Sequence, residues 1–389
     1  MKTEISLLIR VGLIFFVALA TLACVESHSQ NELEKSEKEN LNVPKANFPE
    51  KTQDIWRKTS VDISSPKPVS TIRFYDENVG YAVADSELVY RTIDGGLKWE
   101  KVGEIRGSSI RALFLVSPLV VFAAVNRVPE SSILGANSTA MIVQTTDGGK
   151  NWRSVYKAKS SILETVKFTN RGFGVAVGSR IRSASTLDAE PLTLLSSDNG
   201  ENWIDISKKL FALFGTGTNV GSPVDVMLTD DLGIVVLCHR GGIYRTIDWG
   251  QSWELLERVS DVSLQTNLIR ISRDSAGRLI AVHTSRSGDH GVSSTVYINT
   301  DRFKWSNFSF GRRFFSDVAF LSSGDIVNAG SEGEITSSQG VVLLSTDFGK
   351  TWSVIHRSTE LETFSTIASI TDRRLIVGTD NGQGLILQR

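Results

Sequence analysis

Five short segments of the sequence place an acidic residue at a fixed spacing from a glycine and a tryptophan. They read TIDGGLKW, TTDGGKNW, SSDNGENW, TIDWGQSW and STDFGKTW, and each has Ser or Thr two residues before the Asp. An Asp carboxylate can accept hydrogen bonds from the amides of its own turn, Gly tolerates a positive φ, and Trp can cover the turn with apolar area. The pattern therefore predicts five hairpin turns of one construction. Their residues are Asp94, Gly96 and Trp99; Asp147, Gly149 and Trp152; Asp198, Gly200 and Trp203; Asp248, Gly250 and Trp253; and Asp347, Gly349 and Trp352.

These aspartates are predicted to be structural and not catalytic or metal-binding. A calcium loop alternates several oxygen ligands, whereas each of these turns offers one Asp. His283 and His290 could share a metal ion, but no third ligand is evident, so both are predicted to be exposed to solvent. No phosphate-binding loop, serine nucleophile elbow or Cys/His pair appears. The sequence therefore predicts no catalytic residue, no metal and no other cofactor.

The amino terminus is typical of an export signal. Lys2 and Arg10 precede a charge-free, mostly apolar stretch, VGLIFFVALATLA. This stretch is shorter than the roughly 20 apolar residues that a membrane-spanning helix needs. It ends in TLAC (residues 21–24), which resembles the lipobox of bacterial lipoproteins although threonine stands where leucine is usual. The resemblance implies cleavage before Cys24 and a lipid anchor on that residue; the alternative is an ordinary cleaved signal with an incidental cysteine. Val25 in place of aspartate favours the outer membrane, with the body facing the periplasm or the cell surface.

The rest of the chain divides into a short linker and one long body. Residues 24–51 are polar and charge-mixed without an apolar period, which predicts a flexible tether after the signal peptide of residues 1–23. Residues 52–389 form the predicted body. Cys238 lies in the apolar run GIVVLCH, which favours a buried, inert thiol.

Composition excludes one class of partner. Hydrophobic residues make up 41% of the 389 residues and charged residues 22%, and the formal net charge is -1. A nucleic-acid-binding domain usually has a marked basic excess, so no nucleic-acid partner is expected. The 32 glycines and 8 prolines suit many short strands joined by turns.

The tryptophans set the number of repeats. Seven of the eight open a similar short strand, at spacings of 43, 53, 51, 50, 52 and 47 residues: Trp56, Trp99, Trp152, Trp203, Trp253, Trp305 and Trp352. Three more strands with alternating or β-branched residues precede each Asp segment, and the last repeat supplies only three strands. The pattern predicts an all-β, seven-bladed propeller of four-stranded antiparallel blades, whose last blade is closed by the strand near Trp56. A six-bladed ring, the alternative, would leave that strand unpaired.

Insertions in the repeats indicate a binding face. The Asp turns share one face of the ring, the Asp-box face. The turns between second and third strands and the links between blades share the other, the loop-rich face. Inserted segments concentrated on one face often mark a binding surface; here they are 126–139, 179–191, 207–223, 284–294 and 330–340. Arginine forks on this face suit an acidic partner segment, although a mixed, solvated surface is an equal alternative. The candidate residues are Arg127, Arg180, Arg182, Arg240 and Arg286.

Within the inserted segments, KKLFALF (208–214) combines a basic pair with an apolar run. It is predicted to cap the core, with an exposed docking patch as the alternative.

The turn pattern resembles the Asp box, or BNR repeat, of sialidase-like propellers. A sialidase would need an Arg-Ile-Pro strand near the amino end, and this chain has TIRFYD (71–76) without one. Xyloglucan-cleaving propellers use two rings in tandem, whereas this chain has one. The repeats TTDGGKNW and GFGVAVG are more similar to those of the photosystem II assembly and stability factor family and its relatives in non-photosynthetic bacteria. That resemblance implies a non-catalytic scaffold that holds other proteins.

Two functional hypotheses follow. The favoured one is a monomeric, membrane-tethered scaffold that binds protein partners in the cell envelope. The alternative is a glycan-binding or sialidase-like glycan-cleaving propeller. The inserted segments are almost free of Tyr and Trp, the aromatics that glycan sites usually expose, which favours protein partners.

Overall fold

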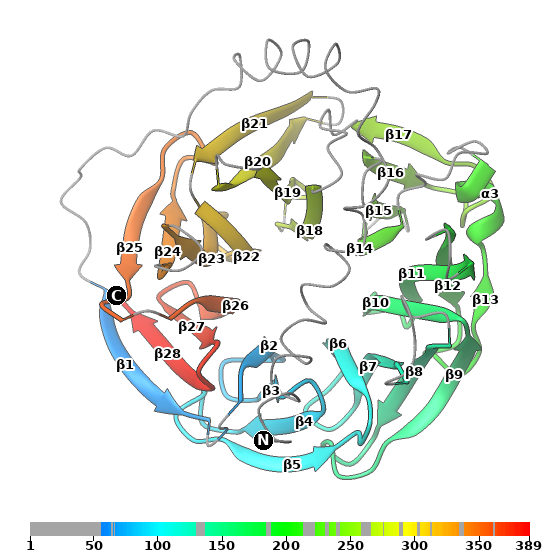
Figure 1. Ribbon diagram of the computed structural model, residues 1–389, viewed down its shortest axis with the longest axis horizontal. Coiled ribbons are helices and arrows are strands. Elements are labelled where there is room, and N and C mark those ends of the chain that lie inside the picture. Colours follow the sequence, from blue (N-terminus) through cyan, green and yellow to red (C-terminus); the bar gives the residue numbers. More distant parts are fainter. Residues whose placement is uncertain are drawn as a thin grey trace, which may run out of the picture.

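The computed structural model describes a ring of seven antiparallel sheets around a central axis (Figure 1). The described residues are 56–63, 65, 67–129, 137–183, 188–212, 222–229, 233–238, 242–257, 266–274, 276–287, 291–301, 304–311, 313–333, 338–360 and 362–389. Each sheet has four strands, and we number the sheets as blades 1 to 7 in chain order. The ring confirms the predicted seven-bladed propeller. The predicted signal peptide, the tether and Cys24 lie outside the described residues.

Each blade is a meander whose first strand lies nearest the axis and whose fourth lies at the rim (Figure 1). Blades 1 to 3 are β2 (Val69–Phe74), β3 (Gly80–Ala84), β4 (Leu88–Thr92) and β5 (Glu100–Glu104); β6 (Ser109–Leu115), β7 (Val121–Arg127), β8 (Thr139–Thr145) and β9 (Arg153–Lys159); β10 (Ser161–Phe168), β11 (Gly174–Ser183), β12 (Asp188–Ser196) and β13 (Ile204–Asp205). Blades 4 and 5 are β14 (Pro223–Leu228), β15 (Ile234–Cys238), β16 (Gly242–Thr246) and β17 (Glu254–Glu257); β18 (Thr266–Arg273), β19 (Leu279–Ser287), β20 (Gly291–Asp301) and β21 (Lys304–Gly311). Blades 6 and 7 are β22 (Arg313–Phe320), β23 (Ile326–Glu332), β24 (Gln339–Ser345) and β25 (Ser353–Arg357); β26 (Phe364–Thr371), β27 (Arg374–Thr379), β28 (Gln383–Gln388) and β1 (Arg57–Asp62).

Blade 7 joins the two ends of the chain, as the sequence predicted. Its outer strand, β1, pairs antiparallel with β28, from Arg57 opposite Gln388 to Asp62 opposite Gln383. Without β1, strand β28 would present a row of unpaired backbone groups at a sheet edge. The amino-terminal strand therefore closes the ring.

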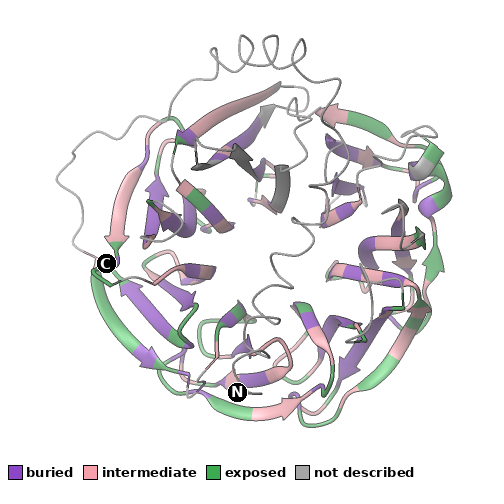
Figure 2. Cartoon of the chain, viewed as in Figure 1, coloured by how far each residue is buried: buried purple, intermediate pink, exposed green. Residues whose placement is uncertain are grey.

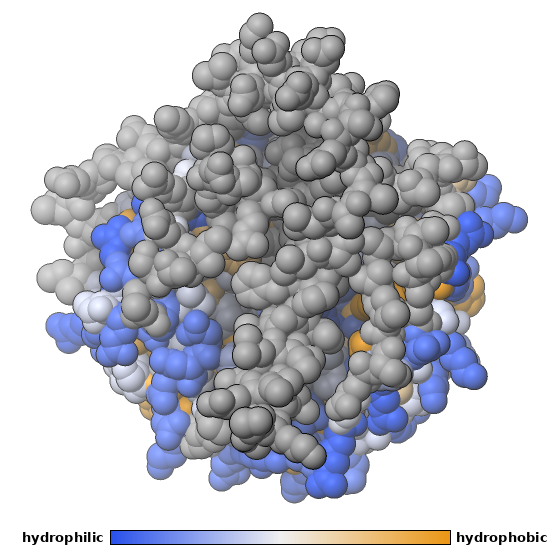
Figure 3. Space-filling view, viewed as in Figure 1, coloured by the Kyte–Doolittle hydropathy of each residue, from blue (hydrophilic) through white to orange (hydrophobic). Residues whose placement is uncertain are grey.

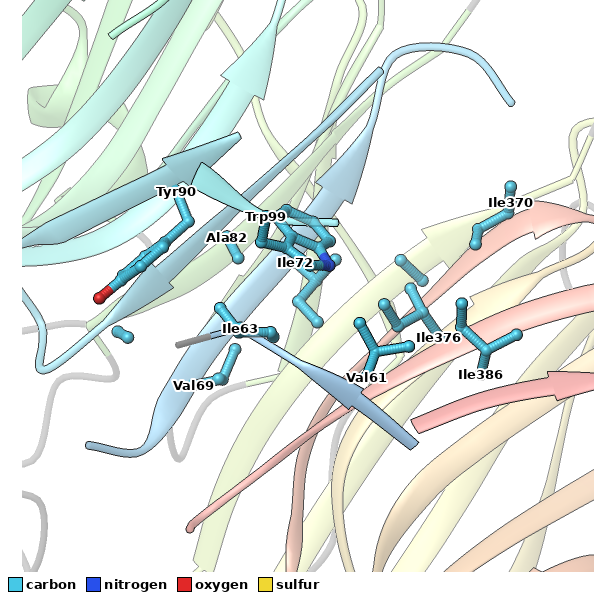
Figure 4. Close-up of a cluster of buried hydrophobic side chains, with 12 residues drawn as sticks. Val61, Ile63, Val69, Ile72, Ala82, Tyr90, Trp99, Ile370, Ile376 and Ile386 are labelled. Carbon is cyan, nitrogen blue, oxygen red and sulfur yellow. The ribbon is translucent and has the colours of Figure 1, made fainter. Parts of the chain in front are cut away.

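The hydrophobic core lies between neighbouring blades. Middle strands are covered on both faces, so β3 and β15 are apolar and buried along their whole length, whereas outer strands such as β5 are exposed or half-buried (Figure 2). Figure 4 shows the cluster between blades 7 and 1, where Val61, Ile376 and Ile386 face Ile72 and Trp99. This cluster unites residues from both ends of the chain across the closure.

All seven inner strands contain a β-bulge at the same place. The pairing with the second strand shifts by one residue between Val69 and Thr71, Ile110 and Ala112, Leu163 and Thr165, Pro223 and Asp225, Leu268 and Arg270, Phe315 and Asp317, and Phe364 and Thr366. A bulge bends the strand and re-aims the side chains beside it. The repeat therefore fixes where side chains of the inner strands meet around the axis.

Three of the inserted segments that we expected to be loops contain long paired strands. Strands β11 and β12 enter 179–191 from its two ends, with Arg180 opposite Glu190. Strands β19 and β20 extend through most of 284–294, and β23 and β24 enter 330–340 from both sides. Pairing satisfies backbone groups that a loop would leave to water. The loop-rich face thus carries projecting hairpins.

One large apolar side chain of the segment after blade 3 is described, and it packs on the core as predicted. The segment begins as helix α3 (Ser207–Ala212), in which Leu210 is fully buried beside Val177 and Val236 of blades 3 and 4. Lys208 and Lys209 are exposed. No helix in the described part of the chain has the length and apolar character that a membrane crossing requires.

We expect removal of β1 to open blade 7. A chain that begins at residue 68 loses the buried side chains Val61 and Ile63, which together contribute about 3–6 kcal/mol of burial free energy. Its midpoint of urea unfolding should fall accordingly, and it should self-associate through the exposed β28 edge. A chain that begins at residue 52 is the matched control and should unfold like the full chain. Equal midpoints for the two truncations would show that β1 does not close the ring.

Candidate functional site

The Asp boxes are tight turns held by their own side chains. In the first, Asp94 Oδ1 accepts hydrogen bonds from the Thr92 hydroxyl (2.8 Å) and the Lys98 N–H (3.0 Å). Thr92 Oγ1 accepts the Gly96 N–H (3.0 Å), and the Trp99 indole donates to the Gly96 carbonyl (3.0 Å). The boxes at Asp147, Asp198, Asp248 and Asp347 repeat the Ser/Thr and Asp contacts. The Asp and the Ser or Thr side chains of each box therefore form hydrogen bonds within their own turn.

Two details of the boxes were not evident from the sequence. Trp249 stands between Asp248 and Gly250 with a φ of 60°, a left-handed conformation that few bulky residues adopt. Its ring packs on Phe173 with centroids 4.8 Å apart, a contact that holds it there. Trp253 is the exception among the five box tryptophans, because its buried indole nitrogen has no hydrogen-bond partner among the described residues.

Hydrogen bonds hold the box carboxylates in their charged form. The Asn151 backbone and side-chain amides and the Thr145 hydroxyl lower the pKa of Asp147 to about 2. The Ser252 hydroxyl and N–H and the Thr246 hydroxyl lower the pKa of Asp248 to about 2. A catalytic acid at neutral pH needs a raised pKa, so these groups are poor proton donors.

The structure brings together two of the five predicted arginines. Arg180 and Arg182 lie on β11 in the hairpin of blade 3, while the exposed Arg127 ends β7 of blade 2 and donates to Ser108 (3.2 Å). Arg286 belongs to β19, but its side chain lies outside the described residues, as does all of Arg240. The predicted surface is therefore described only around blade 3.

A shallow pocket of about 340 Å³ lies beside these arginines, between the blade 3 hairpin and α3. Its lining residues are Arg180, Glu190, Pro191, Asp205, Ser207 and Lys208. Arg180 forms an ion pair with Asp205, and Arg182 forms one with Glu190. The hydrogen bond to Asp205 is the main cause of the raised pKa of Arg180. The pocket offers charged recognition groups of both signs. The hydroxyl of Ser207 in its lining donates to the Asp205 carboxylate, which also accepts the Ser207 N–H (2.9 Å).

A second charged cluster lines the axis, and sequence analysis missed it. Asp317 on β22 forms ion pairs with Arg270 of blade 5 (Oδ1 to Nε, 3.2 Å) and Arg73 of blade 1 (Oδ2 to Nη1, 3.4 Å). It also accepts the Thr366 hydroxyl (2.9 Å) and the Ile367 N–H (3.3 Å) of blade 7. One carboxylate therefore joins four blades.

Asp225 has a similar position in blade 4. Its side chain is fully buried and forms an ion pair with Lys167 Nζ of blade 3 (2.9 Å). It also accepts the Ile271 N–H of blade 5 (3.0 Å). Thr366 repeats the pattern by accepting the Ile72 N–H (3.4 Å). These side chains stand directly after the bulges, which explains why each reaches the next blade.

Asp317 lacks the raised pKa that a catalytic acid needs. Burial by itself would raise the pKa of Asp317, but Arg73 and Arg270 together lower it. Within the described residues, no three His, Cys, Asp or Glu side chains form a metal-binding group. Cys238 is fully buried, and desolvation raises the pKa of its thiol, as expected for an inert core cysteine. His290 and the side chain of His283 lie outside the described residues.

Acidification should weaken the fold through the Asp boxes. Their carboxylates titrate near pH 3.9 when unfolded, and in the folded chain Asp147 and Asp248 titrate at about 2. The stability they contribute is therefore complete above pH 4 and is lost as the pH falls towards 2. Thermal unfolding from pH 5 to pH 2 should show this loss, with a shallower slope in Asp147→Asn and Asp248→Asn variants. Slopes equal to that of the unchanged protein would contradict the assignment.

Asp317→Asn should be strongly destabilising. It leaves Arg73 and Arg270 without their shared counter-charge, and breaking such a buried pair costs about 3–5 kcal/mol. Glu201→Gln, which removes an exposed partner of Arg153, should change the free energy of unfolding by about 1 kcal/mol or less. Urea unfolding measures the loss of free energy of unfolding in each variant. Equal losses would contradict the proposal that Asp317 stabilises the contacts between blades.

Comparisons with known proteins agree with this architecture. Residues 48–160 match the family model described as photosynthesis system II assembly factor YCF48. A comparison with curated proteins gave no match. Among solved structures, YCF48 bound to D1 peptide has 15% identity and a TM-score of 0.58, over 88% of this chain and 100% of that chain. YCF48 from Cyanidioschyzon merolae has 17% identity and a TM-score of 0.58, over 85% and 98%.

An enzyme shares the fold as well. The GH74 xyloglucanase from Xanthomonas campestris has 14% identity and a TM-score of 0.61, over 84% of this chain and 53% of that chain. At such identities the structural likeness shows the fold alone, whereas the family model also matches the sequence of blades 1 and 2. The chain is an Asp-box seven-bladed propeller that resembles the photosystem II assembly factor family, as its repeats predicted.

Proposed function

We propose that this protein is a non-catalytic scaffold, tethered to a membrane of the cell envelope, that binds an acidic segment of a protein partner. The observation that carries the proposal is the pair of arginines beside the blade 3 pocket, with Lys208 and Lys209 next to them. The lipobox-like residues 21–24 supply the proposed anchor at Cys24. The proposed tether would hold the ring at a membrane surface.

The ion pairs of the blade 3 hairpin suit exchange with a partner. Arg182 is exposed and Arg180 is half-buried, and each is paired with a carboxylate of the same blade. Surface pairs of this kind contribute only about 0–1 kcal/mol, so a partner carboxylate can replace an internal one at little cost. A guanidinium fork binds a carboxylate through two parallel hydrogen bonds, which adds specificity.

The surroundings of the pocket also favour a protein ligand. On the face shown in Figure 3, hydrophilic side chains dominate among the described residues of the rim, with apolar ones scattered between them. The exposed large apolar residues of the Asp-box face are spread over three blades: Tyr75, Ile93, Leu97, Val116, Leu119 and Ile247. Single exposed apolar residues are ordinary on soluble proteins. The charged hairpin is therefore the more distinctive surface.

The related YCF48 structure was solved with a D1 peptide, so at least one propeller of this fold binds a peptide. A glycan-cleaving role would require a carboxylic acid with a raised pKa and a second carboxylate near it. Among the described carboxyl groups, Glu257 on the outer strand β17 is the one whose pKa is raised, through burial. Such an isolated group on an outer strand supports the scaffold hypothesis over the enzyme hypothesis.

Charge reversal at the hairpin should weaken partner binding. Affinity capture from detergent-solubilised membranes should recover a partner with the unchanged protein and about 10- to 100-fold less with Arg180→Glu/Arg182→Glu, as expected when about 1.4–2.8 kcal/mol of charge pairing is lost. Arg153→Glu is the matched control, because Arg153 is another exposed, ion-paired arginine, and it should capture normally.

Two further readouts belong to the same experiment. A Cys24→Ser chain should leave the membrane fraction and still bind the partner in solution. Equal capture by the double variant and by Arg153→Glu would overturn the assigned surface. Reproducible turnover of a glycan by the unchanged protein would overturn the scaffold function itself.

A further inference from the structure

The axial cluster contains more positive than negative charge. Arg73, Lys167 and Arg270 come from three inner strands, and their counter-charges are Asp225 and Asp317. Counted over the described residues, three cations against two carboxylates leave one positive charge in excess. The neighbouring pair of Arg111 and Glu164 (2.7 Å) is balanced and does not change this sum.

The carboxylates and the cations differ in how completely their hydrogen-bonding groups are used. Asp225 and Asp317 are at most 3% exposed, and each accepts bonds from two neighbouring blades. The side chains of the three cations are 19% to 30% exposed. The excess charge is therefore on the accessible side of the cluster.

Several donors of the cations have no acceptor among the residues that the structure describes. Arg270 contacts Asp317 through Nε, and neither of its terminal nitrogens donates to a described residue. Arg73 makes its hydrogen bonds with described residues through Nη1, which leaves Nη2 and Nε unused. Lys167 Nζ pairs with one described residue, Asp225, although an ammonium group has three donors.

The three cations are linked through the two carboxylates. Arg73 and Arg270 share Asp317, and Lys167 pairs with Asp225, which accepts the N–H of Ile271, the residue after Arg270. Burial lowers the pKa of Lys167 and of Arg73, whereas the nearby carboxylates raise both, and the pKa of Arg270 is raised. Arg270 lowers the pKa of Lys167 and of Arg73, and a negative charge between the cations would relieve this repulsion.

We propose that the axial cluster is a binding site for a small oxyanion, a carboxylate or a phosphate, held between Arg73, Lys167 and Arg270. Two guanidinium groups and an ammonium group match the several acceptor lone pairs of such an anion, and guanidinium forks bind planar or tetrahedral oxygens bidentately. A metal cation would meet the excess positive charge, and a neutral ligand would leave it uncompensated. This site is separate from the blade 3 surface and does not rest on the proposed function.

A ligand that binds only the folded chain raises its thermal stability. Inorganic phosphate and succinate, each added at a series of concentrations with sodium chloride balancing the ionic strength, should raise the melting temperature by about 2 °C or more at ten times Kd. Calorimetric titration should give one anion per chain. A larger effect of phosphate than of succinate would identify the tetrahedral anion as the ligand class, and the reverse would identify the carboxylate.

Substitution locates the site. Lys167→Met removes the excess charge and should abolish the shift, whereas Arg153→Met removes an exposed rim cation and should leave it unchanged. Lys167→Met also leaves the buried Asp225 without its cation, which could prevent the variant from folding. A second test therefore uses the unchanged protein. Crystals soaked in selenate should show an anomalous peak between Arg73, Lys167 and Arg270.

Two results would overturn the proposal. One is an anomalous difference map that shows selenate at other positions and no peak between Arg73, Lys167 and Arg270. The other is a melting shift from phosphate and succinate no larger than that from sodium chloride at equal ionic strength.

Discussion

The ladder between β1 and β28 makes one ring from two chain ends, and the centre of the molecule depends on it. Once blade 7 is complete, Arg73 of blade 1 reaches Asp317 of blade 6 across the inner strand of blade 7. The hydrogen bond from Ile72 N–H to Thr366 crosses the same closure. An open row of blades would hold neither contact, so the part of the axial cluster that joins blade 1 to blades 6 and 7 depends on closure of the ring. The buried cluster between blades 7 and 1 depends on closure in the same way, because these two blades are neighbours only in a closed ring.

The elements that sequence analysis predicted correctly are those with local chemistry. A Ser or Thr, an Asp, a Gly and a Trp at fixed spacing define a turn whose hydrogen bonds lie within the segment, so the boxes could be identified without knowledge of their neighbours. The Trp series then gave the blade number, and the three-strand final repeat gave the closure. Loops were harder to predict. Part of the polar insertion 179–191 is paired, because the backbone hydrogen bonds between β11 and β12 continue into it from both strands.

The axial cluster could not be predicted because its partners come from different repeats. Asp317 lies 244 residues and Thr366 lies 293 residues after Arg73 in the sequence, and no spacing rule connects them. A signal did exist in the sequence: charged residues interrupt otherwise apolar inner strands, as in PVDVML and RFFSDVAF. A buried charge needs a partner, so such interruptions indicate contacts between blades. The blade 3 surface was predicted through its arginines, but their pairing with Asp205 and Glu190 required the fold.

The boxes hold the turns on one face and charged side chains hold the centre, while the proposed partner surface is the arginine-bearing hairpin of blade 3. Hydrogen–deuterium exchange on the protein with and without its captured partner tests this division most directly. The account predicts slower exchange in β11 and β12 at the blade 3 hairpin and unchanged exchange in the five Asp boxes. Protection of the Asp boxes, with none at the hairpin, would contradict it.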